Sequence, residues 1–267
     1  MKSNATNFGN YLLSWGKQFT GRCMENVLFE SFFEGKHIEV IEKNGIRSLQ
    51  SDRKIVHSRI DLNDPEALIS PYQQQMMLGM VLSLGAESVL HLGLGGGCMV
   101  SFIHKYFPLI HQVVTEKSQT VVALAREYFY LPESPSIQII LNDSTDTGPI
   151  SYRSYDLIFL DLCDSEGPIP TFQIIPYLEK LKGLLMPGGW IVANSWKEGL
   201  ALQGQLKEWQ QLFAKVYYVE GLGESSVIFA SQEQEVLLTV GYPEIAARMA
   251  KAIPLDFKTF LSALQSI

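Results

Sequence analysis

The chain has 267 residues, of which 46% are hydrophobic, and it carries a formal net charge of -7. A chain of this size and composition can bury one substantial core, and no apolar run in it approaches the ~18 residues that a membrane span needs. The acidic charge argues against general nucleic-acid binding and is compatible with a cationic small molecule as partner.

The cysteines and histidines do not predict a metal or redox site. Cys23, Cys98 and Cys163 are far apart and lack the spacing of zinc ligands or of a redox pair, which fits a reducing cytosol. The five histidines show no H-E-x-x-H motif or similar spacing, so we expect no catalytic metal. The start of the chain lacks an A-x-A-like cleavage site. We therefore expect a cytoplasmic protein without a membrane anchor.

Residues 37–49 predict a β-hairpin. Apolar and polar residues alternate on both sides of Asn44 and Gly45, and an Asn-Gly pair between two such segments is the strongest short hairpin signal. A third strand is expected at 54–60. These strands predict a small N-terminal β unit, which together with the segment before it covers residues 1–63.

Residues 64–267 predict a single α/β domain. Ser70 and Pro71 are good N-cap and first-turn residues for a helix over 70–85. Strands and helices then alternate, which is typical of a doubly wound, mostly parallel sheet, and a final hairpin is typical of the methyltransferase-like variant of this Rossmann-like fold. We expect strands at 88–94, 112–116, 137–141, 155–161, 190–195, 215–221 and 226–232, and helices at 99–107, 118–129, 174–185, 243–253 and 255–266.

The ends of the first two parallel strands carry residues that suit a nucleoside. Ligands of open α/β sheets bind outside the carboxyl ends of the strands. The first strand ends in the glycine-rich turn 93–97, where glycines let the backbone approach a ligand closely. The second ends in Glu116, about where an acid accepts hydrogen bonds from ribose hydroxyls. Each feature alone is also typical of a structural turn or a surface acid.

The next two strand ends are acidic as well. Asp143 and Ser144 follow the third strand, where a carboxylate can accept a hydrogen bond from an adenine amino group, although both residue types also favour turns. Asp161 and Asp164 follow the apolar fourth strand, where the reacting atoms are expected. Four strand ends in succession with glycine or acid predict a nucleoside site.

Three features favour an S-adenosyl ligand over a dinucleotide. Cys98 stands where a complete G-x-G-x-x-G motif would need its last glycine. The Pro-Gly-Gly sequence at 187–189 and the final hairpin also favour the S-adenosyl ligand. The N-P-P-aromatic motif of amino-methylating enzymes is absent, and the acidic D-L-C-D at 161–164 occupies its position.

From about residue 38 to residue 231 the sequence resembles the spermidine synthase (polyamine aminopropyltransferase) family. Tyr72 and Gln73 are similar to its tyrosine-glutamine segment, and VVTEKSQTVVALAREYF at 113–129 is similar to its E-I-D stretch. The sequence YDLIFLDLCDSEGP at 155–168 is similar to its aspartate signature, which is the most discriminating of these motifs.

The resemblance implies transfer of an aminopropyl group from decarboxylated S-adenosylmethionine, as a co-substrate, to a small amine such as putrescine. It also implies a homodimer, with no tightly bound cofactor and no metal. Asp161 would accept the proton of the attacking amine, Tyr72 would orient that amine, and Asp164 would hold it. The resemblance and the strand ends assign the donor to Gln73, Gly93, Gly95, Gly96, Glu116, Asp143 and Ser144.

The chain departs from the family at several positions. Gly96 replaces an acid that binds the ammonium of the donor, and an acid there would repel the carboxylate of ordinary S-adenosylmethionine. Leu94 replaces a glycine, and His37 or a neighbour replaces a glutamine. The segment that should hold a late tyrosine offers Glu220 or Glu224. Two alternatives therefore stay open: an S-adenosylmethionine-dependent small-molecule methyltransferase and a non-catalytic nucleoside-binding relative.

Overall fold

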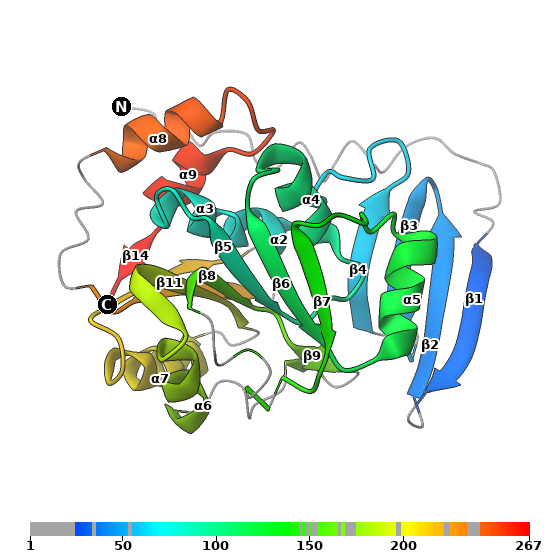
Figure 1. The fold of residues 1–267 in the computed structure, drawn as a ribbon, viewed down its shortest axis with the longest axis horizontal. Coiled ribbons are helices and arrows are strands. Elements are labelled where there is room, and N and C mark those ends of the chain that lie inside the picture. Colours follow the sequence, from blue (N-terminus) through cyan, green and yellow to red (C-terminus); the bar gives the residue numbers. More distant parts are fainter. Residues whose placement is uncertain are drawn as a thin grey trace, which may run out of the picture.

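The computed structural model describes residues 25–33, 36–52, 55–144, 146–147, 150, 154–164, 167–168, 175–195, 199–221, 225–233 and 241–267. These residues form a four-stranded sheet, an eight-stranded sheet and a two-stranded pair, with helices on both faces of the larger sheet (Figure 1). The protein therefore has the α/β class predicted from the sequence.

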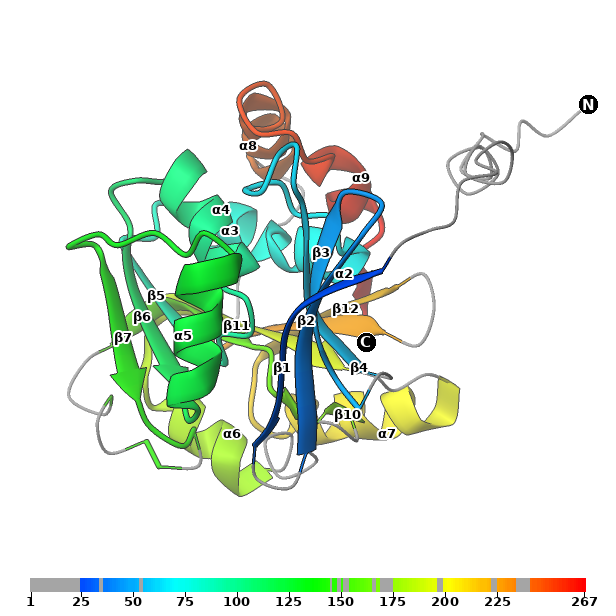
Figure 2. The same cartoon turned by 90° about the vertical axis from the view of Figure 1, so that its right-hand side faces the viewer.

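The four-stranded sheet is an antiparallel meander in the order β1-β2-β3-β4. The β2–β3 hairpin turns at Asn44 and Gly45, with φ angles of 54° and 77°, which the tight Asn-Gly turn requires. This confirms the predicted hairpin, whereas β1 was not predicted. Figure 2 shows this sheet beside α5, and Phe29 of β1 lies 6.4 Å from Tyr128 between ring centroids. The strands are β1 (Asn26–Phe33), β2 (Lys36–Lys43), β3 (Ile46–Ser51) and β4 (Ile55–Asp61).

The eight-stranded sheet has the order β14-β12-β13-β11-β8-β5-β6-β7. Neighbours from β7 to β11 pair in parallel, and β13 lies antiparallel between β11 and β12. The mostly parallel sheet and the final hairpin are thereby confirmed. The strands are β5 (Ser88–Leu92), β6 (His111–Glu116), β7 (Ile137–Leu141), β8 (Tyr155–Leu160), β11 (Leu185–Ser195), β12 (Lys215–Glu220), β13 (Ser226–Ser231) and β14 (Gln265–Ser266), and the separate pair is β9 (Cys163–Asp164) with β10 (Gly167–Pro168).

The helices differ from the sequence prediction in three places. The helix expected over 255–266 ends at Ser262, and residues 265–266 form the strand β14. The single helix expected over 70–85 is two short helices that meet at Met77. The helix between β11 and β12 was not predicted. The helices are α2 (Pro71–Met76), α3 (Leu78–Leu82), α4 (Cys98–Tyr106), α5 (Gln119–Tyr128), α6 (Ile175–Lys182), α7 (Gly199–Gln210), α8 (Tyr242–Met249) and α9 (Phe257–Ser262).

The large sheet separates two apolar cores, because successive side chains of a strand point to opposite faces. On β11, Trp190 and Val192 belong to the core under α2, α3 and α4, whereas Ile191 and Ala193 belong to the core under α6 and α7. Both faces of the sheet are therefore buried, as doubly wound folds require. In the described part of the chain, no helix has both the length and the apolar character needed to cross a membrane.

Candidate active site

The glycine turn lies against the end of β8. Gly93 has a φ of 97°, and a Cβ at this position would lie 2.6 Å from the backbone oxygen of Asp161. The N–H of Leu94 donates to Oε2 of Glu116 at 3.3 Å. The turn after β5 therefore meets the ends of β6 and β8, and Figure 1 shows these carboxyl ends converging near β9. The structure brings together three of the positions that the sequence singled out.

Glu116 is fixed between the glycine turn and the start of α5. Its Oε1 accepts a hydrogen bond from the N–H of Ser118 at 2.9 Å, and the Ser118 hydroxyl in turn accepts one from Val121 as the N-cap of α5. Burial raises the pKa of Glu116, and the N–H donors of Ser118 and Leu94 oppose that rise. The carboxylate is thus held in one orientation at the edge of the sheet, which a side chain that binds a ribose requires.

The end of β7 is tied to its neighbours through Ser144. The buried Ser144 hydroxyl lies 3.1 Å from the hydroxyl of Thr115 on β6, and its carbonyl accepts a hydrogen bond from Tyr177 of α6 at 2.8 Å. Asp143, beside it, is exposed. The pair expected at the adenine therefore consists of a fixed residue and a solvent-facing one.

Asp161 is the centre of a polar network that joins three elements. Its Oδ2 accepts a hydrogen bond from the hydroxyl of Tyr72 at 3.1 Å, and its Oδ1 accepts one from Nδ2 of Asn194 at 3.0 Å. The Ser225 hydroxyl donates to Oδ1 of Asn194 at 3.0 Å. Burial raises the pKa of Asp161, and the two donors oppose that rise. A carboxylate held in this way can attract a cation and take up a proton.

Asn194 and Ser225 were missed by the sequence analysis. Asn194 lies near the carboxyl end of β11, so the strand-end rule that selected Asp161 would also have selected it. Ser225 precedes β13 and carried no comparable signal. The side chains of Asp164 and Glu224, which were expected near the amine, lie outside the described residues.

Gln73 on α2 has an unsatisfied acceptor. Its side chain is 4% exposed, and among the described residues no hydrogen-bond partner reaches its Oε1. A buried acceptor without a partner costs free energy, so such an atom is a natural partner for a ligand N–H or O–H group. The residue adjoins Tyr72, which contacts Asp161. Gln73 therefore remains a residue predicted to bind the S-adenosyl donor.

The position of the missing acid, Gly96, is filled by other residues. A Cβ there would lie 2.8 Å from the ring of Phe129 and 2.9 Å from Cβ of Ser58. The N–H of Gly96 donates to the Ser58 hydroxyl at 2.7 Å, so that amide already has a partner within the protein. The N-terminal sheet, through Ser58 on β4, occupies the space beside the glycine turn.

We expect Gly96→Asp to destabilise the protein by about 3 kcal/mol, because overpacking and a buried charge both carry a cost. The melting temperature should then fall by about 6–12 °C in a calorimetric scan. Gly204→Asp is the matched control, since a Cβ on that α7 glycine meets no atom within 4 Å. An unchanged melting temperature in Gly96→Asp would show that Phe129 and Ser58 move aside.

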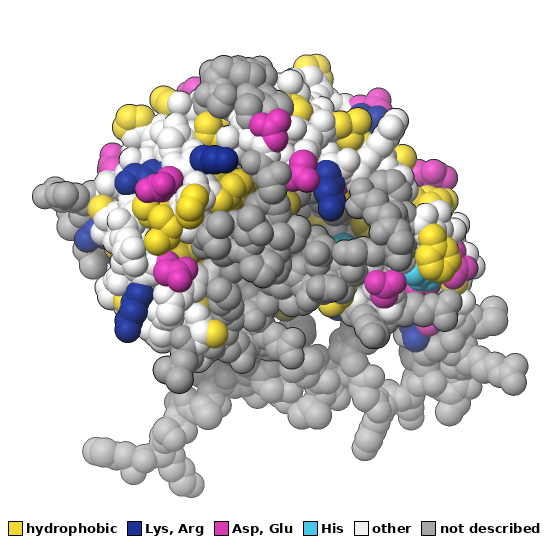
Figure 3. Space-filling view, turned by 90° about the horizontal axis from the view of Figure 1, so that it is seen from below, with side chains coloured by type: hydrophobic (Ala, Val, Ile, Leu, Met, Phe, Trp, Pro, Cys, Tyr) yellow, Lys and Arg dark blue, Asp and Glu magenta, His cyan; other side chains and the backbone are white. Residues whose placement is uncertain are grey.

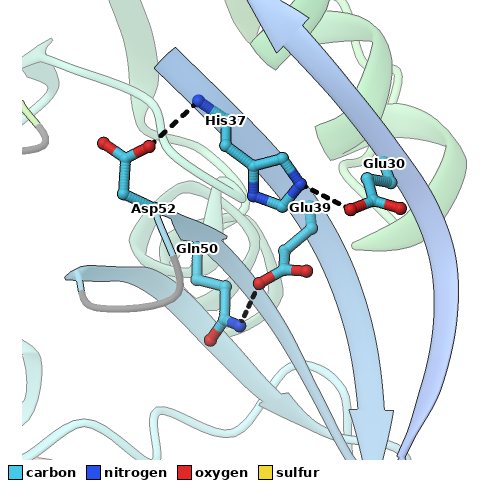
Figure 4. Close-up of polar contacts among 5 residues, drawn as sticks. All are labelled: Glu30, His37, Glu39, Gln50 and Asp52. Atoms are coloured by element: carbon cyan, nitrogen blue, oxygen red, sulfur yellow. Dashed lines mark hydrogen bonds and ion pairs between the residues drawn. The ribbon is translucent and has the colours of Figure 1, made fainter.

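His37, expected near the position of a family glutamine, lies on β2. Its Nε2 is 2.7 Å from Oε1 of Glu30, and its backbone N–H donates to Asp52 (Figure 4). Glu39 is buried and accepts a hydrogen bond from Gln50 at 2.6 Å. Glu30, His37 and Glu39 offer ligand atoms within 4.8 Å of one another, the one such group that the described residues contain. It belongs to the N-terminal sheet and not to the strand-end site.

Acidic and basic side chains are interspersed on the face below the strand ends. Figure 3 views the molecule from this side, and its described parts carry Lys and Arg side chains beside Asp and Glu side chains. A nucleic-acid surface would need a continuous basic stripe, which this described surface does not have.

Comparison with known proteins finds several relatives that share one name, although no family model matches the chain. It is 32% identical over 160 residues to a polyamine aminopropyltransferase of Chromobacterium violaceum, an alignment that covers 60% of this chain and 61% of the relative. It is 27% identical over 236 residues to that of Neisseria meningitidis serogroup A, covering 86% and 89%. The chain is therefore similar to members of the spermidine synthase (polyamine aminopropyltransferase) family. Its relatives of that name are transferases.

A second name also appears among the relatives. The chain is 26% identical over 213 residues to a bovine eEF1A lysine and N-terminal methyltransferase, which covers 71% of this chain and 30% of that protein. Solved structures of both kinds of protein have a fold similar to that of this chain. Spermidine synthase from Thermotoga maritima has a TM-score of 0.70 at 16% identity, covering 89% of this chain and 83% of that one. Human methyltransferase-like protein 13, in complex with SAH, has a TM-score of 0.61 at 21% identity, covering 72% and 93%.

Proposed function

We propose that the protein is an aminopropyltransferase that transfers an aminopropyl group from decarboxylated S-adenosylmethionine to a small diamine such as putrescine. The observation that carries this proposal is the Asp161 carboxylate, held by Tyr72 and Asn194 beside the glycine turn. The names of the relatives supply the reaction class, and the geometry supplies a proton acceptor for it.

The reaction needs a carboxylate because a protonated amine is not a nucleophile. Alkyl amines have pKa values near that of lysine, about 10.4, so the acceptor arrives as a cation. Asp161 attracts the cation and takes its proton. The free amine nitrogen attacks the methylene carbon next to the sulfonium, the carbon–sulfur bond breaks, and its electron pair stays on sulfur to give a neutral thioether. The sulfonium is already an activated leaving group, so positioning supplies much of the remaining rate.

The donor would bind along the ends of β5, β6 and β7. Glu116 would accept hydrogen bonds from the ribose, because its carboxylate is fixed at the strand end. Gly93 and Gly95, both with positive φ, would bring the backbone close to the nucleoside, and the Gly96 position would line the same turn. Gln73 would offer its unpaired oxygen, with Asp143 and Ser144 at the adenine.

The amine would lie between Tyr72 and Asp161, with Asp164 as a second carboxylate for the far ammonium. Two acids suit a diamine, since each end of the substrate is cationic. We further propose a homodimer in the cytoplasm, as expected from the sequence and from the family resemblance.

A second candidate is methyl transfer from ordinary S-adenosylmethionine. Gly96 favours it, because the position carries no acid to repel the carboxylate of that donor. The bovine methyltransferase relative favours it as well. The hydrogen bond between Tyr72 and Asp161 is compatible with both reactions. A non-catalytic relative would not require a carboxylate oriented in this way.

Calorimetric titration of the two donors separates these candidates. We expect decarboxylated S-adenosylmethionine to bind about tenfold more tightly, which is 1.4 kcal/mol, because Glu116 and Asp161 disfavour a further carboxylate in the site. Tighter binding of ordinary S-adenosylmethionine would overturn the aminopropyl assignment in favour of methyl transfer. If neither donor binds, the result would favour a non-catalytic relative. S-adenosylhomocysteine, which keeps the carboxylate without the sulfonium charge, is the control ligand.

A further inference from the structure

We propose that Asn194, oriented by Ser225, positions the Asp161 carboxylate and keeps it ionised so that it can receive the amine as a cation. This inference rests on the proposed function, in which Asp161 is the proton acceptor. It gives a role to two residues that the family resemblance did not single out.

The two oxygens of Asp161 have different partners on different elements. Tyr72 of α2 donates to Oδ2, and Asn194 of β11 donates to Oδ1. The strand register fixes the second contact, since Leu160 of β8 pairs with Ala193 of β11 and the next residues along are therefore neighbours. A carboxylate with a donor on each oxygen cannot rotate freely, so its remaining lone pairs keep one direction.

The orientation of the Asn194 amide follows from its two partners. An ionised carboxylate has no proton to donate, so only the NH₂ end of the amide can face Asp161. The carbonyl end then accepts the hydrogen bond of the Ser225 hydroxyl at 3.0 Å. Asn194 is 8% exposed, so both ends of its amide need protein partners. Ser225 thereby stabilises the orientation that donates to Asp161.

The same hydrogen bond favours the charged form of Asp161. Burial has the largest effect on this carboxyl and raises its pKa. The hydrogen bond from Asn194 has the next largest effect and that from Tyr72 the smallest, and both lower the pKa. A hydrogen bond to the charged form of an acid lowers its pKa. Without the Asn194 donor, more of Asp161 would be protonated at neutral pH, and a neutral acid neither attracts an ammonium group nor takes its proton.

Two other titratable groups lie on the elements around the glycine turn that Asp161 adjoins. The Cys98 thiol of α4 senses the charge of Asp161, but burial is the main cause that raises its pKa to about 11, so it stays neutral at physiological pH. Glu116 on β6 reaches the same glycine turn, and burial raises its pKa too. The partners of Glu116 are Leu94 and Ser118, which a change at Asn194 leaves in place.

The first test is the pH dependence of kcat/KM for putrescine with the Asn194→Leu variant. We expect its acid limb to shift upward by about one unit, which is about a tenfold loss of activity below that limb, with partial recovery as the pH rises. Ser225→Ala should shift the limb in the same direction by less. Ser195→Ala is the matched control, because the hydroxyl of this neighbouring β11 residue donates to Gln205 instead. An equal loss at every pH would contradict the inference.

The second test does not depend on activity. The ¹³C resonance of the Asp161 carboxyl, assigned with the Asp161→Asn variant, reports its pKa directly during a pH titration. We expect a higher pKa in Asn194→Leu than in the unsubstituted protein, and no change in Ser195→Ala. The same titration curve in Asn194→Leu would overturn the inference. A raised pKa in a protein that transfers no aminopropyl group would contradict the proposed function and still support this role of Asn194.

Discussion

Asp161→Asn is expected to lower kcat for aminopropyl transfer about 1,000-fold, because general base catalysis by a positioned side chain contributes about 10²–10⁴. The substitution removes the proton acceptor while keeping the shape of the side chain. Tyr72 can still donate to the new amide oxygen, and the Asn194 amide must then turn so that its oxygen accepts from the new NH₂ group. Turnover is measured with decarboxylated donor and putrescine under saturating conditions.

The controls for Asp161→Asn separate chemistry from binding. Donor affinity, measured by calorimetry, should stay within about threefold, since the donor contacts proposed for Glu116 and the glycine turn are unchanged. Tyr72→Phe keeps the carboxylate and removes one of its two hydrogen-bond donors. We therefore expect a smaller loss of kcat than in Asp161→Asn, and an acid limb of the pH profile that lies at higher pH. Turnover of Asp161→Asn within tenfold of the unsubstituted protein would show that another group accepts the proton.

The order of strands and helices could be predicted because buried parallel strands and amphipathic helices have distinct periods. The run at β8 is apolar almost throughout, as a strand buried on both faces must be. The helix α7 was missed, although Leu202, Leu206 and Trp209 are buried at the spacing i, i+4, i+7. Two glycines, Gly199 and Gly204, weaken the helical propensity of that segment and obscure its pattern.

The strand-end residues could be predicted because the topology alone brings them to one edge. Predicting the positions of Glu116 and Asp161 required only the assignment of β6 and β8 as parallel strands. The contact between Ser58 and Gly96 could not be predicted in this way, because it joins β4 of the small sheet to a turn 38 positions further along the chain. How the N-terminal sheet packs on the large sheet depends on side-chain fit, and a single sequence does not reveal that fit.

The altered glycine turn shows why a departure from a family motif needs a structure to interpret. The sequence presents Gly96 as a lost acid, which suggests an open position in the donor site. The structure shows Phe129 and Ser58 within 3 Å of where its Cβ would be. We therefore expect an acid restored at this position to be hindered by the packing of Ser58 and Phe129.

Gly93→Ala is expected to destabilise the protein by about 3–5 kcal/mol and to abolish donor binding. A φ of 97° is unfavourable for alanine, and the new Cβ would lie 2.6 Å from the backbone oxygen of Asp161. That oxygen cannot move away cheaply, because the N–H of Asp161 donates to Leu92 and ties β8 to β5. The free energy of unfolding is measured by urea denaturation.

Gly85→Ala separates the two causes of this cost. Gly85 also has a positive φ, 75°, but a Cβ there meets no atom within 4 Å. We therefore expect it to lose about 1–2 kcal/mol, the cost of the backbone conformation alone, and to keep full donor affinity. The difference between the two variants measures how closely β5 and β8 approach each other at the site. Equal losses in both would mean that the strands separate to admit the methyl group, and that the close contact of Gly93 with Asp161 does not shape the donor site.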